Sequence, residues 1–349
     1  MLKKFTLSAI AHLFLVANFI SLLPIWLGDL FSHFRMFWTL LSLFLFVIYF
    51  LLLKQGIVKG KLVGIVFFSL FINFVASQPF WTNSQTYSYL FLGSPDKVEV
   101  SEETEYEIQN GKPTKSLLLM NVLSSNTNYE EVKRTIKNTN ADFIVILELN
   151  QRWKKEFEEL KTTYPYNFLD VREDNFGMGV YSKQQFQDSL KIRISQRVIK
   201  VGGEKEELDD FIKENSSKPA SMRIDYTMDN LTLLVTHPIP PINWAAYKER
   251  NGILKSLANI PKKNSSKTLL VGDFNCSPFS ADYKNFLAKS TLKDSQENFG
   301  FQPTWNTSFP FLMQTQLDHV WHSKEIEILH RQTLPIKGSD HKAVYVVFR

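Results

Sequence analysis

Cysteine is almost absent from this chain. Cys276 is the single cysteine among 349 residues, so no disulfide can form within one molecule and a framework of paired cysteines is excluded. A lone thiol could act as a nucleophile, but Cys276 directly follows the polar motif Gly272–Asn275, and this position favours a small packing residue. We detect no internal repeat and no low-complexity tract.

Acidic residues are nearly missing from the first 84 positions. That segment holds six of the 40 lysines and arginines but one of the 35 acidic residues, Asp29, so 34 basic and 34 acidic residues remain for residues 85–349. The pI near 9.0 therefore comes from the front of the chain, and the remainder is formally neutral. Nothing in this bulk charge predicts a tight DNA binder, although it leaves room for a local basic patch.

Long apolar runs fill the same front segment. Phe5–Leu27, Met36–Leu53 and Leu62–Phe80 each hold 18 to 23 residues, enough to cross ~30 Å of hydrocarbon. A cleaved signal peptide is the alternative, but the first run is longer than a usual signal core, no Ala-x-Ala site follows it, and two more runs come next. We predict three transmembrane helices within residues 1–81, with the lipid bilayer contacted through residues 5–80.

Polar residues inside these runs are few and uncharged. His12, Asn18 and Asn73 are interpreted as hydrogen-bonding between helices. Because the runs contain no charge, a transport role is not favoured.

Lysines indicate the orientation of the three helices. Lys3 and Lys4 precede the first run, and Lys54, Lys59 and Lys61 lie between the second and third. The positive-inside rule places both groups in the cytoplasm. Three crossings would then put the rest of the chain outside.

The remaining residues divide into a linker and a globular domain. Residues 82–115 are polar and are predicted to be a linker or stalk. Strands and helices alternate from residue 116 to residue 349, which predicts an α/β fold, a two-sheet α/β sandwich of ~230 residues. The charged stretch Gly202–Lys218 is predicted to be a surface insertion.

Six polar motifs in this domain each adjoin an apolar run. They are Asn121, Glu148, Thr236-His237, Gly272–Asn275, Leu317–Val320 and Ser339–His341. Apolar runs of this kind indicate buried strands, so the polar side chains should gather along one edge of packed sheets. Carboxylates, amides and imidazoles in that position are typical of a metal-assisted phosphoester hydrolase. Each motif taken singly also suits a surface turn.

Two positions can be interpreted further from local chemistry. Glu148 ends a strongly apolar strand, where a carboxylate is costly unless it is paired or bound to a metal such as Mg²⁺ or Mn²⁺. Capping of a helix that begins near Gln151 is the alternative. Asp273 and Asn275 alternate with Phe274 and should point to the same side.

The order of the motifs resembles the endonuclease/exonuclease/phosphatase superfamily, which has the deoxyribonuclease I-like fold. The resemblance covers roughly Ser116 to Arg349, and the GDFN and SDH elements are its most specific parts. With apolar helices in front, the chain is similar to the membrane-anchored bacterial branch. This implies a multi-pass protein of the bacterial inner (cytoplasmic) membrane with an extracytoplasmic catalytic domain.

The resemblance also implies roles for the metal and substrate residues. Glu148 would be the principal metal ligand, with Asn121 as a metal or phosphate contact and Asp340 completing the metal surroundings. Asn275 would donate to a phosphoryl oxygen. Trp305 is a candidate for the substrate mouth, with core packing as the alternative.

The implied catalytic set is His237, Asp273, Asn275, Asp318 and His341. Asp273 would orient or deprotonate water, and His341 would act at the phosphate while Asp318 fixes its tautomer. His319 follows Asp318 in a strand and should point the opposite way.

His237 separates branches of the superfamily. Abasic-site endonucleases of the exonuclease III type carry Tyr-x-Pro-Asn where this chain has Thr236-His237-Pro238. A histidine here is similar to deoxyribonuclease I, bacterial sphingomyelinases and inositol-polyphosphate phosphatases, so DNA repair is not favoured.

The leading hypothesis is a membrane-anchored, divalent-metal-dependent phosphodiesterase or nuclease with an extracytoplasmic active site. One alternative is a phospholipid or sphingolipid headgroup hydrolase, and another is a non-catalytic binding module on the same scaffold. The expected partners are a phosphoester substrate, either nucleic acid or lipid headgroup, and the bilayer. No obligate protein partner is indicated.

Overall fold

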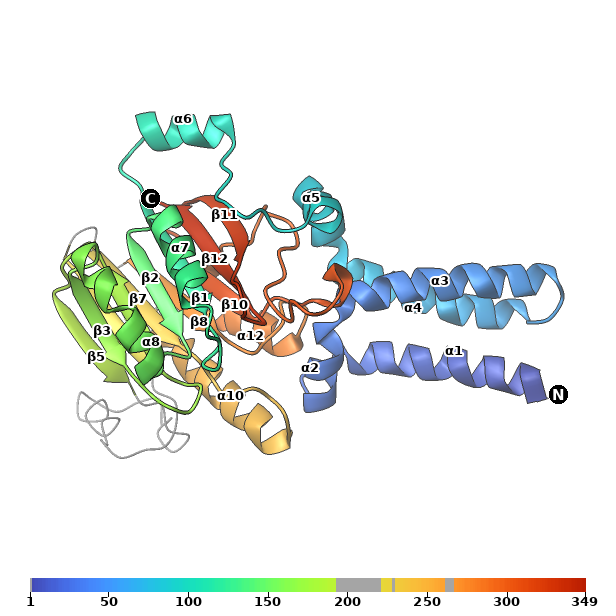
Figure 1. Cartoon of the computed structure of the whole chain (residues 1–349). Helices are drawn as coiled ribbons and strands as arrows, with labels where there is room; N and C mark the ends of the chain where they lie inside the picture. Colours follow the sequence, from blue (N-terminus) through green and yellow to red (C-terminus); the bar gives the residue numbers. More distant parts are fainter. Residues whose placement is uncertain (1, 193–220, 228–229, 261–266) are drawn as a thin grey trace.

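The computed structural model describes residues 2–192, 221–227, 230–260 and 267–349, so the predicted insertion at 202–218 lies outside the described residues. A long helical arm projects from a layered α/β domain (Figure 1). The arm consists of α1 (Leu2–Ile20), α3 (Arg35–Lys54) and α4 (Gly60–Trp81), and the short α2 (Trp26–His33) lies where the arm meets the domain.

Two helices of the arm, α3 and α4, are long and apolar enough to cross a membrane. At ~1.5 Å per residue each is about 30 Å long. The first predicted span is shorter than the sequence indicates, because its apolar helix covers Phe5–Ile20. The chain then turns before α2, at a place where Pro24 lacks the N–H that a continuous helix needs.

Polar side chains join the three arm helices. Asn73 donates to Asn18 Oδ1 and accepts from Arg35 Nη1, both at 2.8 Å, so Asn18 and Asn73 form interhelical hydrogen bonds as predicted. Arg35, fully buried at the start of α3, also donates to Ser21 Oγ at 2.7 Å. His12 differs, because its Nδ1 donates within α1 to the carbonyl of residue 8.

The segment expected to be a linker contains two helices, α5 (Ser84–Leu92) and α6 (Glu102–Asn110). Helix α5 is bonded to the α/β domain. Thr86 Oγ1 accepts from the backbone of Phe301 at 2.8 Å, and Tyr89 Oη accepts from the backbone of Thr333 at 3.1 Å. This segment therefore packs on the domain along part of its length.

The domain is built on two six-stranded sheets among the described residues, which confirms the predicted α/β sandwich. Each sheet has a parallel pair at its centre, β1–β2 in the first and β7–β8 in the second, with antiparallel strands around it. The first sheet, in spatial order, is β11 (Ile328–Pro335), β12 (Lys342–Phe348), β1 (Lys115–Asn121), β2 (Phe143–Leu147), β4 (Met178–Ser182) and β3 (Tyr166–Asp170). The second is β5 (Asp188–Ile192), β6 (Ser221–Tyr226), β7 (Leu231–Thr236), β8 (Lys267–Asp273), β10 (Asp318–His322) and β9 (Lys293–Asp294).

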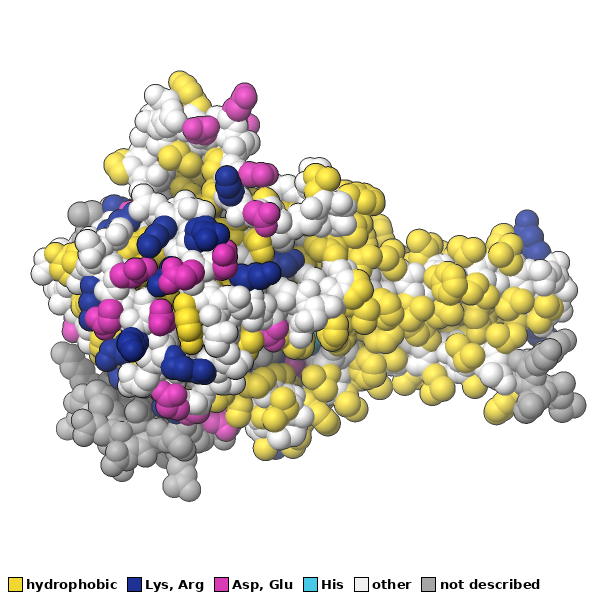
Figure 2. All heavy atoms as spheres, in the orientation of Figure 1, with side chains coloured by type: hydrophobic (Ala, Val, Ile, Leu, Met, Phe, Trp, Pro, Cys, Tyr) yellow, Lys and Arg dark blue, Asp and Glu magenta, His cyan; other side chains and the backbone are white. Residues whose placement is uncertain are grey.

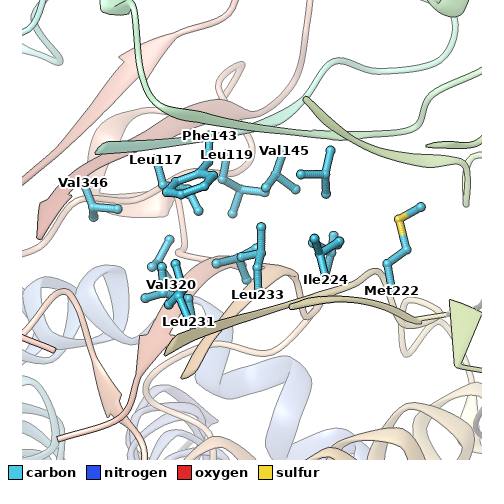
Figure 3. Close-up of a cluster of buried hydrophobic side chains, with 14 of the residues drawn as sticks. Leu117, Leu119, Phe143, Val145, Met222, Ile224, Leu231, Leu233, Val320 and Val346 are labelled. Carbon is cyan, nitrogen blue, oxygen red and sulfur yellow. The ribbon is translucent and has the colours of Figure 1, made fainter. Parts of the chain in front are cut away.

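The main core lies between the sheets. In Figure 3 side chains such as Leu117 and Phe143 from the first sheet face Leu231 and Leu233 from the second. The outer faces are covered by helices and turns, so the central strands are buried on both sides and have continuous apolar sequences. The covering elements are α7 (Tyr129–Thr139), α8 (Gln151–Glu156), α10 (Trp244–Leu257), α12 (Ala281–Ser290) and the 3-10 turns η1 (Glu158–Thr162) and η3 (Phe311–Met313).

Candidate active site

Strand ends of both sheets meet at one edge of the sandwich. Asp273 ends β8 and lies directly opposite Asp318, the first residue of the antiparallel β10. On the other sheet Asn121 ends β1, and its carbonyl accepts from Ser339 Oγ at 2.8 Å, two residues before His341. The register of the sheets therefore brings four of the six sequence motifs together.

Asp318 and His341 form a tight buried pair. Nδ1 of His341 donates to Asp318 Oδ2 at 2.8 Å, which leaves Nε2 facing Asp273. Both backbones are held by hydroxyl groups: Ser339 Oγ accepts from His341 N at 3.0 Å, and Thr304 Oγ1 accepts from Asp318 N at 3.2 Å. Burial alone would lower the pKa of His341, but the charge and hydrogen bond of Asp318 dominate and raise it to about 10.

Asp273 occupies the centre of the site. Its Oδ2 lies 3.5 Å from Nε2 of His237, 3.7 Å from Nε2 of His341 and 3.5 Å from Nδ2 of Asn121. Its Oδ1 accepts from the backbone of Asn275 at 2.9 Å. Burial opposes ionisation, but the hydrogen bond from His237 and the charges of both imidazoles hold the pKa of Asp273 well below its usual range. Asp273 is therefore a carboxylate at neutral pH.

His237 is the second imidazole of the site. It is buried, its ring contacts Phe176 with centroids 5.4 Å apart, and its Nδ1 has no hydrogen-bond partner among the described residues. Burial lowers the pKa of His237, but the hydrogen bond and charge of Asp273, with the charge of Glu148, outweigh burial and raise it. A protonated His237 has a proton to transfer.

Three buried groups could hold a metal ion. One ligand atom from each of Asp273, Asp318 and His341 lies within 4.8 Å of the others. Oδ1 of Asp318 is buried without a partner among the described residues, and such an atom is costly unless a ligand meets it. Two carboxylates and one imidazole suit a divalent cation such as Mg²⁺ or Mn²⁺.

The residues expected to bind the metal lie around this group rather than within it. Glu148 follows β2 in a left-handed backbone conformation (φ 62°), and its carboxylate accepts from Ser124 N at 2.9 Å. Asp340 accepts from the indole Nε1 of Trp305 at 2.9 Å, so Asp340 and the substrate-mouth candidate Trp305 hold one another. Asn121 contacts Asp273. Their role as ligands stays a prediction.

Asn275 connects the loop after β8 with the loop after β7. Its Nδ2 donates to the carbonyl of Pro238 at 3.1 Å, beside His237. One hydrogen of that amide remains for a phosphoryl oxygen.

His319 and Cys276 belong to the packing. His319 is buried on the other side of β10, where Nε2 donates to the carbonyl of Cys276 at 2.8 Å. Burial raises the pKa of the Cys276 thiol to about 12, which makes it a poor nucleophile.

Sequence reasoning missed several supporting residues. Thr304 holds the backbone of Asp318 through its hydroxyl, and Ser124 holds the Glu148 carboxylate through its backbone N–H. Neither contact has a signal in the local sequence. Ser339 was visible as part of the Ser-Asp-His motif. Asp29 contacts the site region from 221 positions away along the chain, through Arg250, and no local signal could indicate it.

Comparisons with solved structures place the fold. D. rerio TDP2 complexed with single strand DNA product is 16% identical, with 68% of this chain and 100% of that chain covered at a TM-score of 0.53. The human Nocturnin catalytic domain with bound sulfate anion is 16% identical, with 68% and 93% covered at 0.51. An endonuclease/exonuclease/phosphatase from Bacteroides vulgatus is 12% identical, with 68% and 99% covered at 0.52. A search of curated proteins found no match.

Residues 118–341 match the sequence model of the "Endonuclease/Exonuclease/phosphatase family". That match contains every motif named above, from the end of β1 to the start of β12. The chain belongs to the endonuclease/exonuclease/phosphatase family and is a hydrolase acting on ester bonds.

Proposed function

We propose that this protein is a membrane-anchored, divalent-metal-dependent phosphoester hydrolase of the phosphodiesterase or nuclease type, with its active site outside the cytoplasm. The observation that carries the proposal is the position of Asp273, a buried carboxylate with one imidazole on each side and Asp318 behind the second. Such a group can accept a proton from water and supply one to a leaving oxygen.

The residues divide the reaction between them. Asp273 orients or deprotonates the attacking water, while His341, fixed through Nδ1 by Asp318, presents Nε2 to the phosphoryl group. His237 protonates the leaving oxygen from the other side of Asp273. Asn275 and Asn121 offer amide N–H groups to phosphoryl oxygens.

A divalent cation fits this centre by its donor set. One possible group of ligands is Asp273, Asp318 and His341. The set that the family resemblance implies is Glu148, Asn121 and Asp340. When bound, the ion would offset negative charge on the phosphoryl oxygens.

The shape of the arm supports the proposed orientation. The N-terminus and the turn between α3 and α4 lie together at the end far from the catalytic domain (Figure 1). Lys54, Lys59 and Lys61 are exposed around that turn, and Figure 2 shows dark-blue side chains beyond an otherwise yellow arm. The positive-inside rule assigns this tip to the cytoplasm and hence the domain to the opposite side.

A lipid-borne phosphoester is a second candidate substrate, favoured by an apolar surface beside His237. Ile242, in the loop that follows it, is 72% exposed, and Trp244, at the start of α10, is 49% exposed. Trp26 of α2 donates from Nε1 to the carbonyl of Pro241 at 2.7 Å, so this loop adjoins the arm. Exposed Ile and Trp side chains near membrane helices suit the headgroup region.

The decisive experiment is a substrate panel on the full chain in lipid nanodiscs. Plasmid DNA, RNA, phospholipid and sphingolipid vesicles and aryl phosphates would each be tested with Mg²⁺, Mn²⁺ and Ca²⁺, with Asp273→Asn as the inactive control. Metal-dependent hydrolysis that Asp273→Asn lacks supports the proposal. No hydrolysis of any phosphoester, or equal activity in EDTA, contradicts it.

Topology requires a separate test. A C-terminal alkaline phosphatase fusion should be active, and a C-terminal green fluorescent protein exported by the general secretion route should be dark. The opposite pair of results would place the domain in the cytoplasm and make intracellular nucleic acid the better substrate class.

A further inference from the structure

Helix α2 reaches the active-site loop through a buried ion pair. Nη1 of Arg250, on α10, donates to Asp29 Oδ2 at 2.8 Å. Asp29 is 1% exposed and Arg250 is 0% exposed. A contact so far from solvent is little screened by water or salt, so it differs in kind from the exposed ion pairs on the domain surface.

The same guanidinium nitrogen holds the Gly272–Asn275 loop. Nη1 of Arg250 also donates to the carbonyl of Asn275 at 2.5 Å. Asn275 has a left-handed backbone (φ 49°), which asparagine adopts more readily than other non-glycine residues. From Asn275, the backbone N–H reaches Asp273 and the side chain reaches Pro238. Asn275 thus contacts both Asp273 and the residue next to His237.

Helix α2 is fixed in place by its own contacts. Gly28 lies so close to the end of α1 that an added Cβ would be 2.4 Å from the carbonyl oxygen of Ile20 and 2.3 Å from that of Leu23. His33 donates from Nδ1 to the carbonyl of Asp29 at 2.7 Å, and Trp26 reaches the Pro241 carbonyl. Asp29 is therefore presented to Arg250 by a segment packed against both the arm and the domain.

Little else could replace Asp29. The other carboxylate near Arg250 is Asp282, whose Oδ2 is 3.5 Å from Nη2 and also accepts from Tyr247 Oη at 2.8 Å. Without Asp29, the fully buried guanidinium would keep its neutral acceptors, the Asn275 carbonyl and Asn251 Oδ1, but a single distant counter-charge, Asp282. A buried charge left without close compensation is strongly unfavourable. Arg250 would then shift toward Asp282 or toward solvent, away from the Asn275 carbonyl.

We propose that Asp29 and Arg250 are positioning residues of the active centre, so that helix α2, from the N-terminal part of the chain, holds the Gly272–Asn275 loop in its catalytic conformation. The catalytic consequence rests on the proposed function, whereas the mechanical link does not. It follows that the α/β domain of residues 116–349 alone lacks part of the catalytic support.

Cys276 provides a reporter that is independent of activity. It is the single cysteine, it is fully buried, and it adjoins Asn275. A loop that opens locally exposes its side chains to reagents in proportion to the open population. The rate at which a small maleimide labels Cys276 therefore measures how firmly the loop is held.

The experiment compares the wild-type chain, Asp29→Asn and Asp96→Asn in nanodiscs. Asp96 is an exposed carboxylate of the 82–115 segment and makes the matched control. We expect Asp29→Asn to raise the labelling rate of Cys276 by ~10-fold or more. Its kcat on bis(p-nitrophenyl) phosphate should fall ~10²-fold with KM nearly unchanged, because small displacements of reacting groups cost rates of that order. Asp96→Asn should match the wild type.

A double variant covers the case in which Asp29→Asn does not fold. Asp29→Asn with Arg250→Met removes the uncompensated charge but also the donor to Asn275. A positioning role predicts a folded protein with low kcat and reactive Cys276, whereas wild-type kcat and labelling in this double variant would overturn the proposal. Wild-type kcat in a folded Asp29→Asn would overturn it as well. If the wild type hydrolyses no phosphoester, the proposed function fails, and the labelling rates still decide the link.

Discussion

The helical arm and the catalytic centre both bury polar side chains, but they space them differently. Asn73 in the arm meets Arg35 and Asn18 at 2.8 Å. In the catalytic centre, Asp273 Oδ2 is 3.5 Å from Nε2 of His237. Separations near 2.8 Å are those of complete hydrogen bonds, whereas 3.5 Å is at the limit. We call the arm cluster closed because Asn73 makes complete hydrogen bonds there, and the catalytic cluster open because the contacts of Asp273 Oδ2 are long.

This difference in spacing indicates different roles: the buried polar groups of the arm hold the structure together, and those of the candidate site are placed for chemistry. In the arm, Arg35 donates through Nη1 and Nη2 to the neutral oxygens of Asn73 and Ser21, so the cluster joins the helices. In the candidate site, Asp318 and His341 form a complete hydrogen bond, but Asp273 Oδ2 stands 3.5 Å and 3.7 Å from the two imidazoles, and a water, a cation or a phosphoryl oxygen could bind beside these long contacts. Variants in the two clusters should therefore affect different properties.

The largest expected effect is loss of turnover in the catalytic cluster. Asp273→Asn removes the water-orienting carboxylate, and His341→Ala removes the imidazole at the phosphate. Each should lower kcat by ~10²-fold or more, while far-ultraviolet circular dichroism stays that of the wild type. Asp188→Asn, the same chemical change on the edge strand β5, is the control and should retain activity. Wild-type kcat in either site variant would remove that residue from the mechanism.

The second effect concerns the two imidazoles and depends on the leaving group. If His237 protonates the leaving oxygen, its removal should matter most where the leaving group is poor, since a nitrophenolate departs without help and an alkoxide does not. His237→Ala should lower hydrolysis of an alkyl diester by ~10²-fold and largely spare bis(p-nitrophenyl) phosphate. His341→Ala should damage both reactions.

The control for this experiment is His330→Ala, a half-buried imidazole on β11 that is bonded to Gln332 at 3.2 Å. It should leave both rates unchanged. Equal losses on the two substrates for His237→Ala would refute the acid role and leave His237 as a phosphate-binding or structural residue.

A third effect should appear in the arm, on stability and not on rate. Asn73→Ala leaves Arg35 Nη1 and Asn18 Oδ1 without their partner, at a cost of about 1–2 kcal/mol in the unfolding free energy. The melting temperature in detergent should fall while kcat, measured well below that temperature, stays unchanged. His12→Ala, whose hydrogen bond stays within α1, should leave both as they are. A fall in kcat without a fall in melting temperature would mean that the arm network supports catalysis directly.

Much of the fold was predictable, and so was the gathering of several candidate site residues, because both follow from local patterns. Asp273 is the last residue of a buried strand, Asp318 is the first residue of another, and His341 directly precedes a third. Strand ends share an edge, so the alternation of apolar and polar residues was enough to group them. The arrangement of two sheets followed from the same alternation of elements.

The finer geometry was not predictable, because it depends on contacts between distant segments. The pattern around Ser339–His341 could not indicate that Asp340 turns to Trp305 while His341 turns to Asp318. The break at the end of α1 and the return of α2 to Arg250 are likewise set by tertiary packing. Periodicity indicates the end of a strand at which a residue lies, but the partner of its side chain comes from the assembled fold.

The last expected effect is a pH dependence of stability that arises from the Asp318–His341 pair. The folded-state pKa of His341 is raised to about 10, because the charge and hydrogen bond of Asp318 outweigh burial. An unfolded histidine titrates near ~6.5. The pair therefore contributes its full stability below about pH 6.5, and that contribution is lost as pH rises through about 10. Asp273 behaves in the opposite sense: its depressed pKa gives stability above about pH 4 that is lost as pH falls further.

Asp318→Asn separates the contribution of this pair from the other titrations of the molecule. In EDTA, we expect the variant to unfold about 2–3 kcal/mol more easily than the wild type near pH 6, because a protonated and buried His341 has then lost its counter-charge. Near pH 10 the gap should shrink to below about 1 kcal/mol, since the wild-type imidazole is then losing its proton as well. The measurement is urea unfolding at several pH values in matched detergent. A gap that stays constant from about pH 6 to about pH 10 would mean that Asp318 only orients His341 and does not hold its proton, and the catalytic cluster would then resemble the closed cluster of the arm.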